Sequence, residues 1–510
     1  MKKPIKYSFV FAFLFLLSNK NFAQTPGGVR TGLHLWLKAD VGTTVSGTTV
    51  TGWNDQSGNT FNLTGLTSTG PALATGILNY NPGLAFNSTH NYLKRAAPGI
   101  FGTGTSYSNL NYYIVYNSSD ASSFHWMVYQ GTTGFDRFSH SMNYSGTTEG
   151  DLDATTTNRL SYTTATGVPL MVSYMNSSTA ITGTSKSLLY LNAKLIQSNT
   201  AYTPYVGVND QFQVGDQTTS SVDAPNSPFL GNMHEIILYT GANTLAQRRQ
   251  IESYLAIKYG DTLNESGSSN GVSSNYVNSS GTSIYSDFSV PTYWNNVIGI
   301  ARDDSSGLYQ KQSHQLDDSA RIYLSALAAT NSANTGTFSS NNQFVVMGNN
   351  KLSMANTGST QYPAGITGRM GREWQITNTG CTASYSIDIK LPSTFCVIDP
   401  TQLKLIVGNN SNLTTGTVFT ALNGLIFSYA SGVITIGNIT NTIIPLNSTK
   451  YFTLNISATA ASVGGTRLWP GYRRGQPGPE ELDEMKARRI ALGWRLVGVL
   501  LYTTFFRQKA

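Results

Sequence analysis

The segment Glu149-Gly-Asp151-Leu-Asp153 has an acidic side chain at every second position, a spacing that would let all three contact one metal ion. Ca²⁺ binds several oxygen ligands from carboxylates and carbonyls, and these three residues could supply three of them. Calcium is therefore the one cofactor that the sequence suggests. The alternative is a solvated loop, which Gly150 and the neighbouring Thr residues favour, because Asp and Gly are typical turn residues. Two further acidic pairs have the same two interpretations: Asp303 with Asp304, and Asp317 with Asp318.

Hydrolysis of a glycan would need carboxylates in a different arrangement. A retaining glycoside hydrolase places two carboxylates about 5 Å apart, usually on one strand in a Glu-x-Asp-x-x-Glu pattern. Residues 30–260 do not contain this pattern, and Glu481-Leu-Asp-Glu484 lacks its last acid. The chain also has no Gly-x-Ser-x-Gly motif, and its six His residues show no metal-ligand spacing. We therefore predict a protein that is not an enzyme, with glycan hydrolysis as the minor alternative.

The stretch from Phe124 to His140 is the candidate for ligand binding. It is rich in aromatic side chains, which offer stacking area to sugar rings, and a polar residue beside them could hydrogen-bond a hydroxyl group. The candidate ligand-binding residues are Trp126, Tyr129, Phe135 and Asp136. The alternative is a β-strand of the core, in which every second side chain points inward and is closed to ligand.

The first 23 residues read as a secretion signal. Lys2, Lys3 and Lys6 precede the apolar run Tyr7–Leu17, and Ala23 is a suitable cleavage point. The run is too short to span a bilayer, which takes about 20 residues. We therefore expect a protein that is secreted or held on the outer cell surface after cleavage near Ala23.

Export also sets the redox state expected of the two cysteines. Cys381 and Cys396 flank the alternating segment Tyr385–Leu391, and disulfides form outside the cytoplasm. A bridge that closes this short loop could contribute about 3 kcal/mol to stability. We predict a Cys381–Cys396 disulfide, with two free buried thiols as the alternative.

The net charge of +7 comes from the two ends of the chain. Residues 1–24 carry four Lys and no acid, and residues 461–510 carry seven Arg, two Lys and four acids. The segment between them has 20 basic and 22 acidic residues. A nucleic-acid-binding domain is usually strongly basic, so the composition argues against a nucleic-acid partner.

Most of the chain consists of short apolar runs separated by Gly, Asn, Ser and Thr, which is typical of a β-sandwich. One segment has helical periodicity instead. Thr244 and Gln247 form a capping box, and Gly260 is a typical C-terminal stop. These signals predict an amphipathic helix over 245–259 that closes the first domain. Three cations are expected on its solvated face: Arg248, Arg249 and Lys258.

The composition changes at two further points along the chain. Residues 261–290 are rich in Ser, Asn and Gly, which predicts a boundary between a first domain at 28–262 and a second β-rich domain at 263–458. Residues 459–510 form an atypical Arg-rich tail that reads as partly helical. Within it, 490–506 is mostly apolar and is the one segment that could contact a membrane. A disordered extension and an erroneous or shifted reading frame are the alternatives for the tail.

Several motifs resemble those of a known class of secreted proteins. Leu33–Asp40, Trp53–Asn59 and the run from His234 to Gly260 resemble concanavalin A-like (LamG-type) jelly-roll domains of surface and secreted proteins from Bacteroidota. The segments 293–304 and 307–313, with others further on, resemble the uncharacterised β-rich domain that commonly follows. The resemblance implies an all-β fold, with a jelly-roll sandwich and then a second sandwich-like domain. The tail resembles none of the sorting domains that often end such proteins.

These observations leave three functional interpretations. The first is a non-catalytic exported protein that binds carbohydrate or acts in adhesion, with glycans or cell-surface proteins as partners. The second is a structural or protein-interaction protein in which the sandwiches are spacers. The third is the hydrolase considered above. Trp36 and Trp53 are expected in the sandwich core, and Asp55-Gln-Ser-Gly-Asn59 is expected to form a tight turn.

Overall fold

A computed structural model describes residues 24–455, with gaps at 66, 69, 88–90, 122–123, 132–136, 143–146, 152–158, 217–226, 264–274, 287–292, 318, 356–360 and 393–398. The predicted signal sequence and the tail therefore lie outside the described residues. The chain separates into one compact unit over residues 1–457 and another over residues 458–510. All of the structure below belongs to the first unit, and the predicted domain boundary at 262 stays a prediction.

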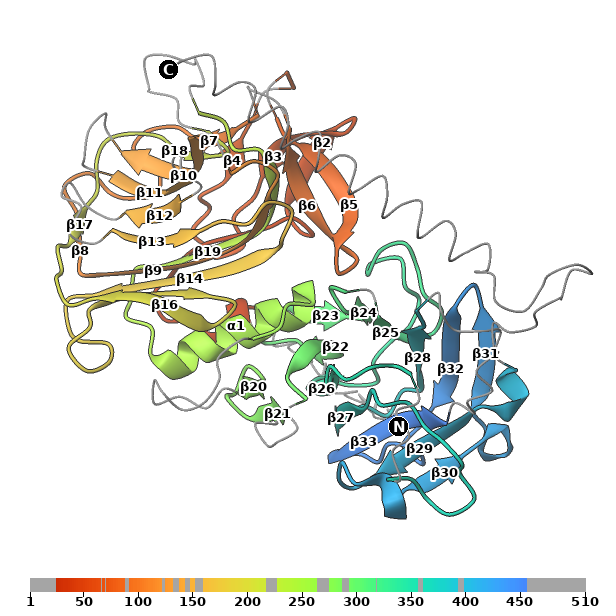
Figure 1. Cartoon of the computed structure of the whole chain (residues 1–510). Helices are drawn as coiled ribbons and strands as arrows, with labels where there is room; N and C mark the ends of the chain where they lie inside the picture. Colours follow the sequence, from red (N-terminus) through yellow and green to blue (C-terminus); the bar gives the residue numbers. More distant parts are fainter. Residues whose placement is uncertain are drawn as a thin grey trace, which may run out of the picture. The chain divides into compact units, whose positions relative to one another are not determined.

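The fold is almost entirely antiparallel β-structure, as predicted (Figure 1). In the first half, 17 strands form one continuous hydrogen-bonded network that folds into two layers. The layer next to the helix contains β1 (Leu33–Lys38), β6 (Asn81–Phe86), β9 (Asn109–Ser118), β14 (Leu170–Ser177), β15 (Ser187–Leu191), β16 (Lys194–Asn199) and β19 (Gly231–Tyr239). β5 (Ala72–Leu78) joins it to the far layer.

The far layer completes the sandwich. It contains β2 (Thr43–Ser46), β3 (Thr49–Trp53), β4 (Leu63–Thr64), β7 (Leu93–Arg95), β10 (His125–Gly131), β11 (Arg137–Met142), β12 (Thr147–Asp151), β13 (Leu160–Thr163) and β18 (Phe212–Val214). A small separate pair is β8 (Ser106–Tyr107) with β17 (Tyr205–Val206). The core between the layers is apolar and includes Leu35, Leu37, Trp53 and Ile114.

The second half is also built from two sheets around an apolar core. The larger sheet runs β23 (Leu308–Gln310), β22 (Asn295–Asp303), β26 (Gln343–Asn349), β27 (Trp374–Thr379), β33 (Ser448–Asn455), β29 (Lys404–Gly408) and β30 (Thr417–Phe419). The smaller runs β24 (Gln312–His314), β25 (Ala320–Leu324), β28 (Tyr385–Lys390), β32 (Val433–Ile439) and β31 (Ile426–Ala430). The hairpin of β20 (Tyr276–Val277) and β21 (Ser283–Tyr285) forms a separate two-stranded sheet. Four short 3-10 helices lie at 26–28, 400–402, 413–415 and 421–423.

The helix α1 (Leu245–Tyr259) has the predicted bounds. The Thr244 hydroxyl accepts a hydrogen bond from the Gln247 N–H, and the Gln247 side chain accepts one from the Thr244 N–H. Gly260 ends the helix in the left-handed conformation, with φ of 69°, which suits glycine because it has no Cβ. The local capping signals therefore set both ends of the helix.

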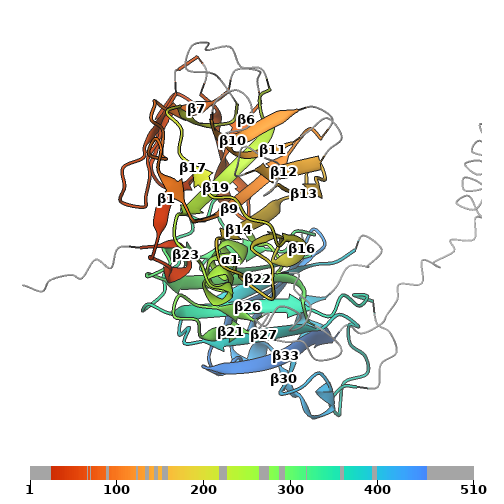
Figure 2. The ribbon, with the colours of Figure 1, turned by 90° about the vertical axis from the view of Figure 1, so that its left-hand side faces the viewer.

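The prediction that Arg248, Arg249 and Lys258 face solvent is wrong. They are 0%, 1% and 3% exposed. The physical reason is that α1 is covered by two sheets. Its apolar residues share one core with the outward side of the first sandwich, through Trp36 and Ile237, and with the larger sheet of the second half, through Val297 and others. Figure 2 shows α1 between β14 and β22, and from Ile251 to Tyr259 every residue of the helix is buried.

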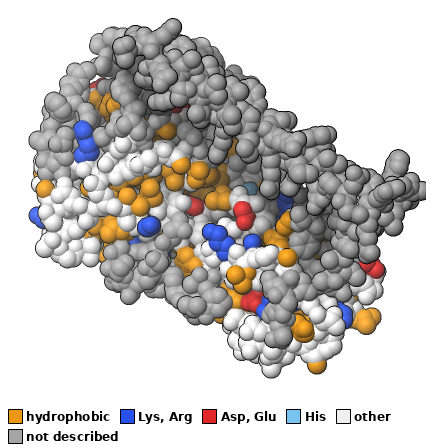
Figure 3. Space-filling view, in the orientation of Figure 1, with side chains coloured by type: hydrophobic (Ala, Val, Ile, Leu, Met, Phe, Trp, Pro, Cys, Tyr) orange, Lys and Arg blue, Asp and Glu red, His pale blue; other side chains and the backbone are white. Residues whose placement is uncertain are grey.

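Within the described part of the chain, no helix combines the length and the apolar composition needed to cross a membrane. The segment 490–506 lies outside that part. On the face seen in Figure 3, charged side chains of both signs lie scattered among apolar and uncharged ones.

Candidate functional site

Two of the aromatic candidates from the sequence, Trp126 and Tyr129, lie in strand β10, as the core alternative implies. Trp126 is 7% exposed and Tyr129 is 2% exposed, and their rings contact each other with centroids 4.8 Å apart. The other two candidates, Phe135 and Asp136, lie outside the described residues. The two described rings are therefore packed rather than open, and a ligand role for this stretch stays a prediction.

The predicted calcium ligands lie around strand β12. A loop was expected here, and for 147–151 that expectation is wrong, because these residues pair with β11 and β13. Gly150 allows the strand to form, since a Cβ there would lie 2.1 Å from the Tyr112 hydroxyl. Nothing is described of the side chains of Glu149 and Asp151, or of Asp153.

The other acidic pairs are engaged in protein contacts. Asp303 accepts hydrogen bonds from the backbone and hydroxyl of Ser279, and Asp304 is ion-paired with Arg302. Asp317 accepts a hydrogen bond from Ser319, and Asp318 lies outside the described residues. No group of three His, Cys, Asp or Glu among the described residues could hold a metal ion. Calcium binding stays a prediction.

Cys381 is fully buried and its thiol is free in the structure. Burial raises the pKa of this thiol to about 11, so it is protonated at neutral pH. Cys396 lies outside the described residues, so the predicted disulfide stays a prediction.

A pocket beside strand β1 has the features of a ligand site. It has a volume of about 430 Å³. Its walls come from the start of the described chain, from β1 and from the loop after β3. The lining residues are Gln24, Thr25, Arg30, Leu33, Trp36, Lys38, Val41, Gln56, Ser57 and Gly58. We call this the β1 pocket.

One wall of the β1 pocket is a loop fixed by Asp55. The Asp55 carboxylate accepts hydrogen bonds from the Trp36 N–H at 2.9 Å, from the Ser57 N–H at 2.9 Å and from the Phe61 N–H at 3.1 Å. Asn59 adds a hydrogen bond from its Nδ2 to the carbonyl of His34 at 2.9 Å. This confirms the turn predicted for 55–59. The hydrogen bonds to the backbone of Trp36 and His34 hold the loop against β1.

Strand alternation places Trp36 and Lys38 together on the outward side of β1. Leu35 and Leu37 point into the sandwich core, and Trp36 joins the helix-side core. Trp36 is 1% exposed, which confirms the predicted burial, although it lies under the pocket rather than between the two layers. Its indole Nε1 donates a 2.6 Å hydrogen bond to Oε1 of Glu235.

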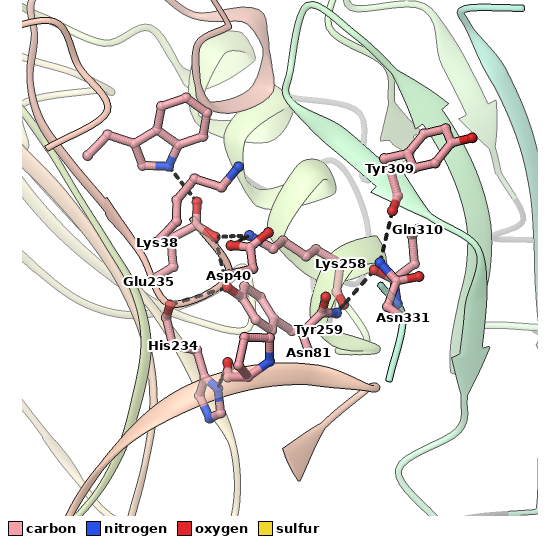
Figure 4. Close-up of polar contacts among 12 residues, drawn as sticks. Lys38, Asp40, Asn81, His234, Glu235, Lys258, Tyr259, Tyr309, Gln310 and Asn331 are labelled. Carbon is pink, nitrogen blue, oxygen red and sulfur yellow. Dashed lines mark hydrogen bonds and ion pairs between the residues drawn. The ribbon is translucent and has the colours of Figure 1, made fainter. Parts of the chain in front are cut away.

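Glu235 is the centre of an ion cluster of Asp40, Glu235, Tyr254, Lys258 and Tyr259, which we call the buried ion cluster; Asp40 lies at its solvent edge, with 29% of its side chain exposed. Its carboxylate also accepts hydrogen bonds from the Tyr254 hydroxyl, the Tyr259 hydroxyl and Lys258 Nζ, each at 2.8 Å. Lys258 Nζ donates a further bond to Asp40 Oδ1 at 2.8 Å. Both carboxylates are therefore satisfied by Lys258 and its neighbours (Figure 4).

The charges in this cluster shift one another's pKa values. Burial alone would raise the pKa of Asp40, but the positive charges of Lys258 and Lys38 outweigh it and lower the pKa to about 2. Burial opposes the charge on Lys258, yet Asp40 and Glu235 raise its pKa above the ordinary value. Lys258 therefore stays charged inside the protein because it has two carboxylate partners.

Lys38 is a buried cation of a different kind. Its residue is 4% exposed, and its Nζ lies 4.6 Å from the centre of the Trp36 ring. Burial, together with the charge of Lys258, lowers its pKa, while Asp40 and Glu235 oppose the shift. The structure records no hydrogen bond or ion pair of its ammonium group with the described residues, and Figure 4 shows it apart from the Lys258–Glu235 pair.

Sequence reasoning missed both the buried ion cluster and Lys38. The alternation Leu35-Trp36-Leu37-Lys38 was the available signal, because it puts a lysine beside a tryptophan on one side of a strand. The contact with Glu235 joins residues 199 positions apart, which no local pattern reveals.

Part of the chain matches a sequence family. The family model described as "Domain of unknown function (DUF8202)" matches residues 247–438, a segment that begins in α1 and ends in β32. Comparison with curated proteins found no match.

Solved structures provide further similarities. The chain is similar to domain 4 of AbnA, a GH43 extracellular arabinanase from Geobacillus stearothermophilus, in complex with arabinotriose, with 15% identity over 43% of this chain and 97% of that chain and a TM-score of 0.27. It is similar to the CBM40 of the Ruminococcus gnavus IT-sialidase bound to α2,3 sialyllactose, with 14% identity over 30% and 93% and a TM-score of 0.23. It is also similar to the binding domain of Botulinum neurotoxin serotype D, with 10% identity over 85% and 98% and a TM-score of 0.35.

Proposed function

We propose that this chain is a non-catalytic, exported glycan-binding protein and that the β1 pocket is its binding site. The observation that carries the proposal is the lining of the pocket. Leu33 and Val41, of which Val41 is 43% exposed, supply apolar area, and the side chains of Gln24, Gln56 and Ser57 supply polar groups. Ligand sites combine apolar or aromatic area with a few well-placed polar groups, and this lining has both.

The pocket also has the size and the fixed geometry that binding requires. Its volume of about 430 Å³ lies within the range of roughly 300–1,000 Å³ found for small-molecule sites. The Asp55 hydrogen bonds hold the loop with Gln56 and Ser57 against β1. A site whose walls are already ordered loses less entropy when it binds, which favours affinity.

Binding of the full chain to a glycan array tests this proposal. Gln56→Ala removes a half-buried polar side chain of the pocket and should weaken binding at least fivefold. Gln402→Ala is the matched control, because Gln402 is an exposed residue of the second half and should leave binding unchanged. Incubation of bound glycans with the protein should release no reducing ends. Absence of binding to any glycan at millimolar concentration, or equal loss in both variants, would contradict the proposal.

A rigid spacer is the second candidate function, and one observation favours it. Helix α1 shares a single apolar core with both halves of the first unit. The Asn81 side chain of β6 adds hydrogen bonds to the backbone of Lys258 and to Gln310 of β23 (Figure 4). These contacts would hold the two halves in a fixed relative orientation. If no glycan binds, and unfolding followed by probes in each half is a single transition, the spacer function is the better explanation.

A further inference from the structure

We propose that the β1 pocket selects sugars that carry an anionic group, a carboxylate or a sulfate, and that Lys38 and Arg30 bind this group. The inference rests on the proposed function, since it names the class of glycan that the same pocket would take. It starts from the charges that line the pocket. Lys38 and Arg30 are both cationic, and the residues that line the pocket include no Asp or Glu.

The first argument is that the ammonium group of Lys38 is buried without a hydrogen-bond acceptor among the described residues. An ammonium group carries three donors, and a buried charged group is normally paired and hydrogen-bonded. Lys38 is 4% exposed, and the only recorded close contact of its ammonium group with the described residues is with the face of Trp36, at 4.6 Å. A cation over an aromatic ring gains some energy, but its donors stay unused. A ligand oxygen in the pocket would satisfy them.

The protein's own carboxylates do not take this role. Glu235 already accepts hydrogen bonds from Trp36, Tyr254, Tyr259 and Lys258, and its two oxygens are both engaged. Asp40 is bound to Lys258. Pairing Glu235 with Lys38 would require an existing buried hydrogen bond to change, and no ion pair between Asp40 and Lys38 is recorded among the described residues. The unpaired donors of Lys38 are therefore better matched to an anion that comes from outside.

Arg30 supplies the second cation, and its position differs from that of Lys38. It is exposed, and no hydrogen bond or ion pair of its guanidinium with the described residues is recorded. A guanidinium can form two parallel hydrogen bonds with an oxyanion. An anionic sugar in the pocket would meet one buried cation, Lys38, and one exposed cation, Arg30. A neutral sugar would leave the donors of Lys38 unmatched.

The test compares closely related sugars on the full chain. Binding is measured by calorimetry with a disaccharide that contains glucuronate, its counterpart with glucose in that position, and a counterpart with a sulfated glucose. We expect the two anionic sugars to bind at least tenfold more tightly than the neutral one, with the difference shrinking as salt is raised. The carboxylate and sulfate arms show which oxyanion the site prefers.

Variants then locate the effect. Lys38→Met keeps the length of the side chain, and Arg30→Gln keeps a polar group at an exposed position. Each should lower the affinity for the anionic sugars at least tenfold, down to that of the neutral sugar. Lys194→Gln, at an exposed cation of β16, is the control and should change neither. Circular dichroism and the melting temperature show that each variant is folded.

The outcomes separate this inference from the proposed function. Equal affinity for neutral and anionic sugars, lost in Gln56→Ala, keeps the glycan-binding function and overturns the selectivity. Tight binding of anionic sugars that neither Lys38→Met nor Arg30→Gln weakens also overturns the role of these residues. No binding of any sugar overturns the proposed function and this inference together.

Discussion

The indole Nε1 of Trp36 lies 2.6 Å from Oε1 of Glu235, to which it donates a hydrogen bond. The Trp36 side chain therefore lines the β1 pocket and also binds the central carboxylate of the buried ion cluster. The two residues belong to neighbouring antiparallel strands, in which Trp36 is opposite Ile237 and Lys38 is opposite Glu235. The lining of the pocket is therefore built on a polar network that also holds helix α1. Changes in the cluster should be detected both in stability and in ligand binding.

Trp36→Phe is the simplest test of this relationship. Phenylalanine keeps an aromatic ring but has no N–H, so Glu235 loses one of its donors. Removal of a hydrogen bond to a buried charged group costs about 1–3 kcal/mol. We expect the free energy of unfolding in urea to fall by that amount and glycan affinity to fall with it. Tyr309→Phe, which removes a hydroxyl from a residue that is 40% exposed, is the control and should be nearly neutral.

The two lysines of this region should respond in opposite ways to the same substitution. Lys258→Met leaves Asp40 and Glu235 without their cation, and an unpaired buried charge costs about 3–5 kcal/mol. Lys38→Met removes a buried cation that has no ion-pair partner, so stability should be unchanged or higher. Chemical denaturation of both variants measures the difference. Similar losses in the two would show that Lys38 is a member of the cluster rather than a ligand group.

The fold could be predicted where local chemistry decides it. The capping box at Thr244 and the stop at Gly260 gave the bounds of α1, and the Asp55 turn was recognised from its residue types. Short apolar runs between turn residues gave the β-sandwich class. In each case the interactions that form the element lie within a few residues of one another.

The candidate site could not be predicted in the same way. Three cations of α1 were expected in water because a charged helix face is usually solvated, yet two sheets distant in sequence cover Arg248, Arg249 and Lys258. A loop was expected in place of strand β12, because the reason for Gly150 is not local: the hydroxyl of Tyr112, on another strand, leaves no room for a Cβ there. The β1 pocket likewise needs Gln24, Thr25 and Arg30, the loop with Gln56, Ser57 and Gly58, and strand β1 to meet, which is a property of the tertiary fold.

Asp261, just after α1, should make the protein less stable as pH rises. Its carboxyl is 5% exposed, and burial raises its pKa to about 7, against an ordinary value near 3.8. Between these two values the folded state holds a proton that the unfolded state has lost. Stability therefore falls by up to about 1.4 kcal/mol per pH unit from pH 4 to pH 7. Asp261→Asn should remove this slope and be the more stable form at pH 8; parallel pH profiles of the two proteins would refute the assignment.

Two buried histidines should produce the opposite trend in acid. Burial lowers the pKa of His140 to about 3 and, as the main cause, that of His234 to about 4. The His140 ring lies between the hydroxyls of Tyr112 and Tyr162, at 3.1 and 3.0 Å. In each case the unfolded chain binds a proton from pH 6.5 downward while the folded protein stays neutral, so stability is lost as pH falls.

Each histidine should contribute a loss of about 1.4 kcal/mol per pH unit between pH 6.5 and its folded pKa. Because Asp261 acts in the opposite direction over much of this range, the trend is best measured in the Asp261→Asn background. There, urea unfolding should show stability falling from pH 6.5 to pH 4.5, and His234→Gln should reduce the slope by about 1.4 kcal/mol per pH unit. His140→Gln should reduce it by a similar amount, although it also changes the contacts with the two tyrosines, and His34, whose pKa burial also lowers, adds to what is left. An unchanged slope in His234→Gln would show that His234 is already charged in the folded protein.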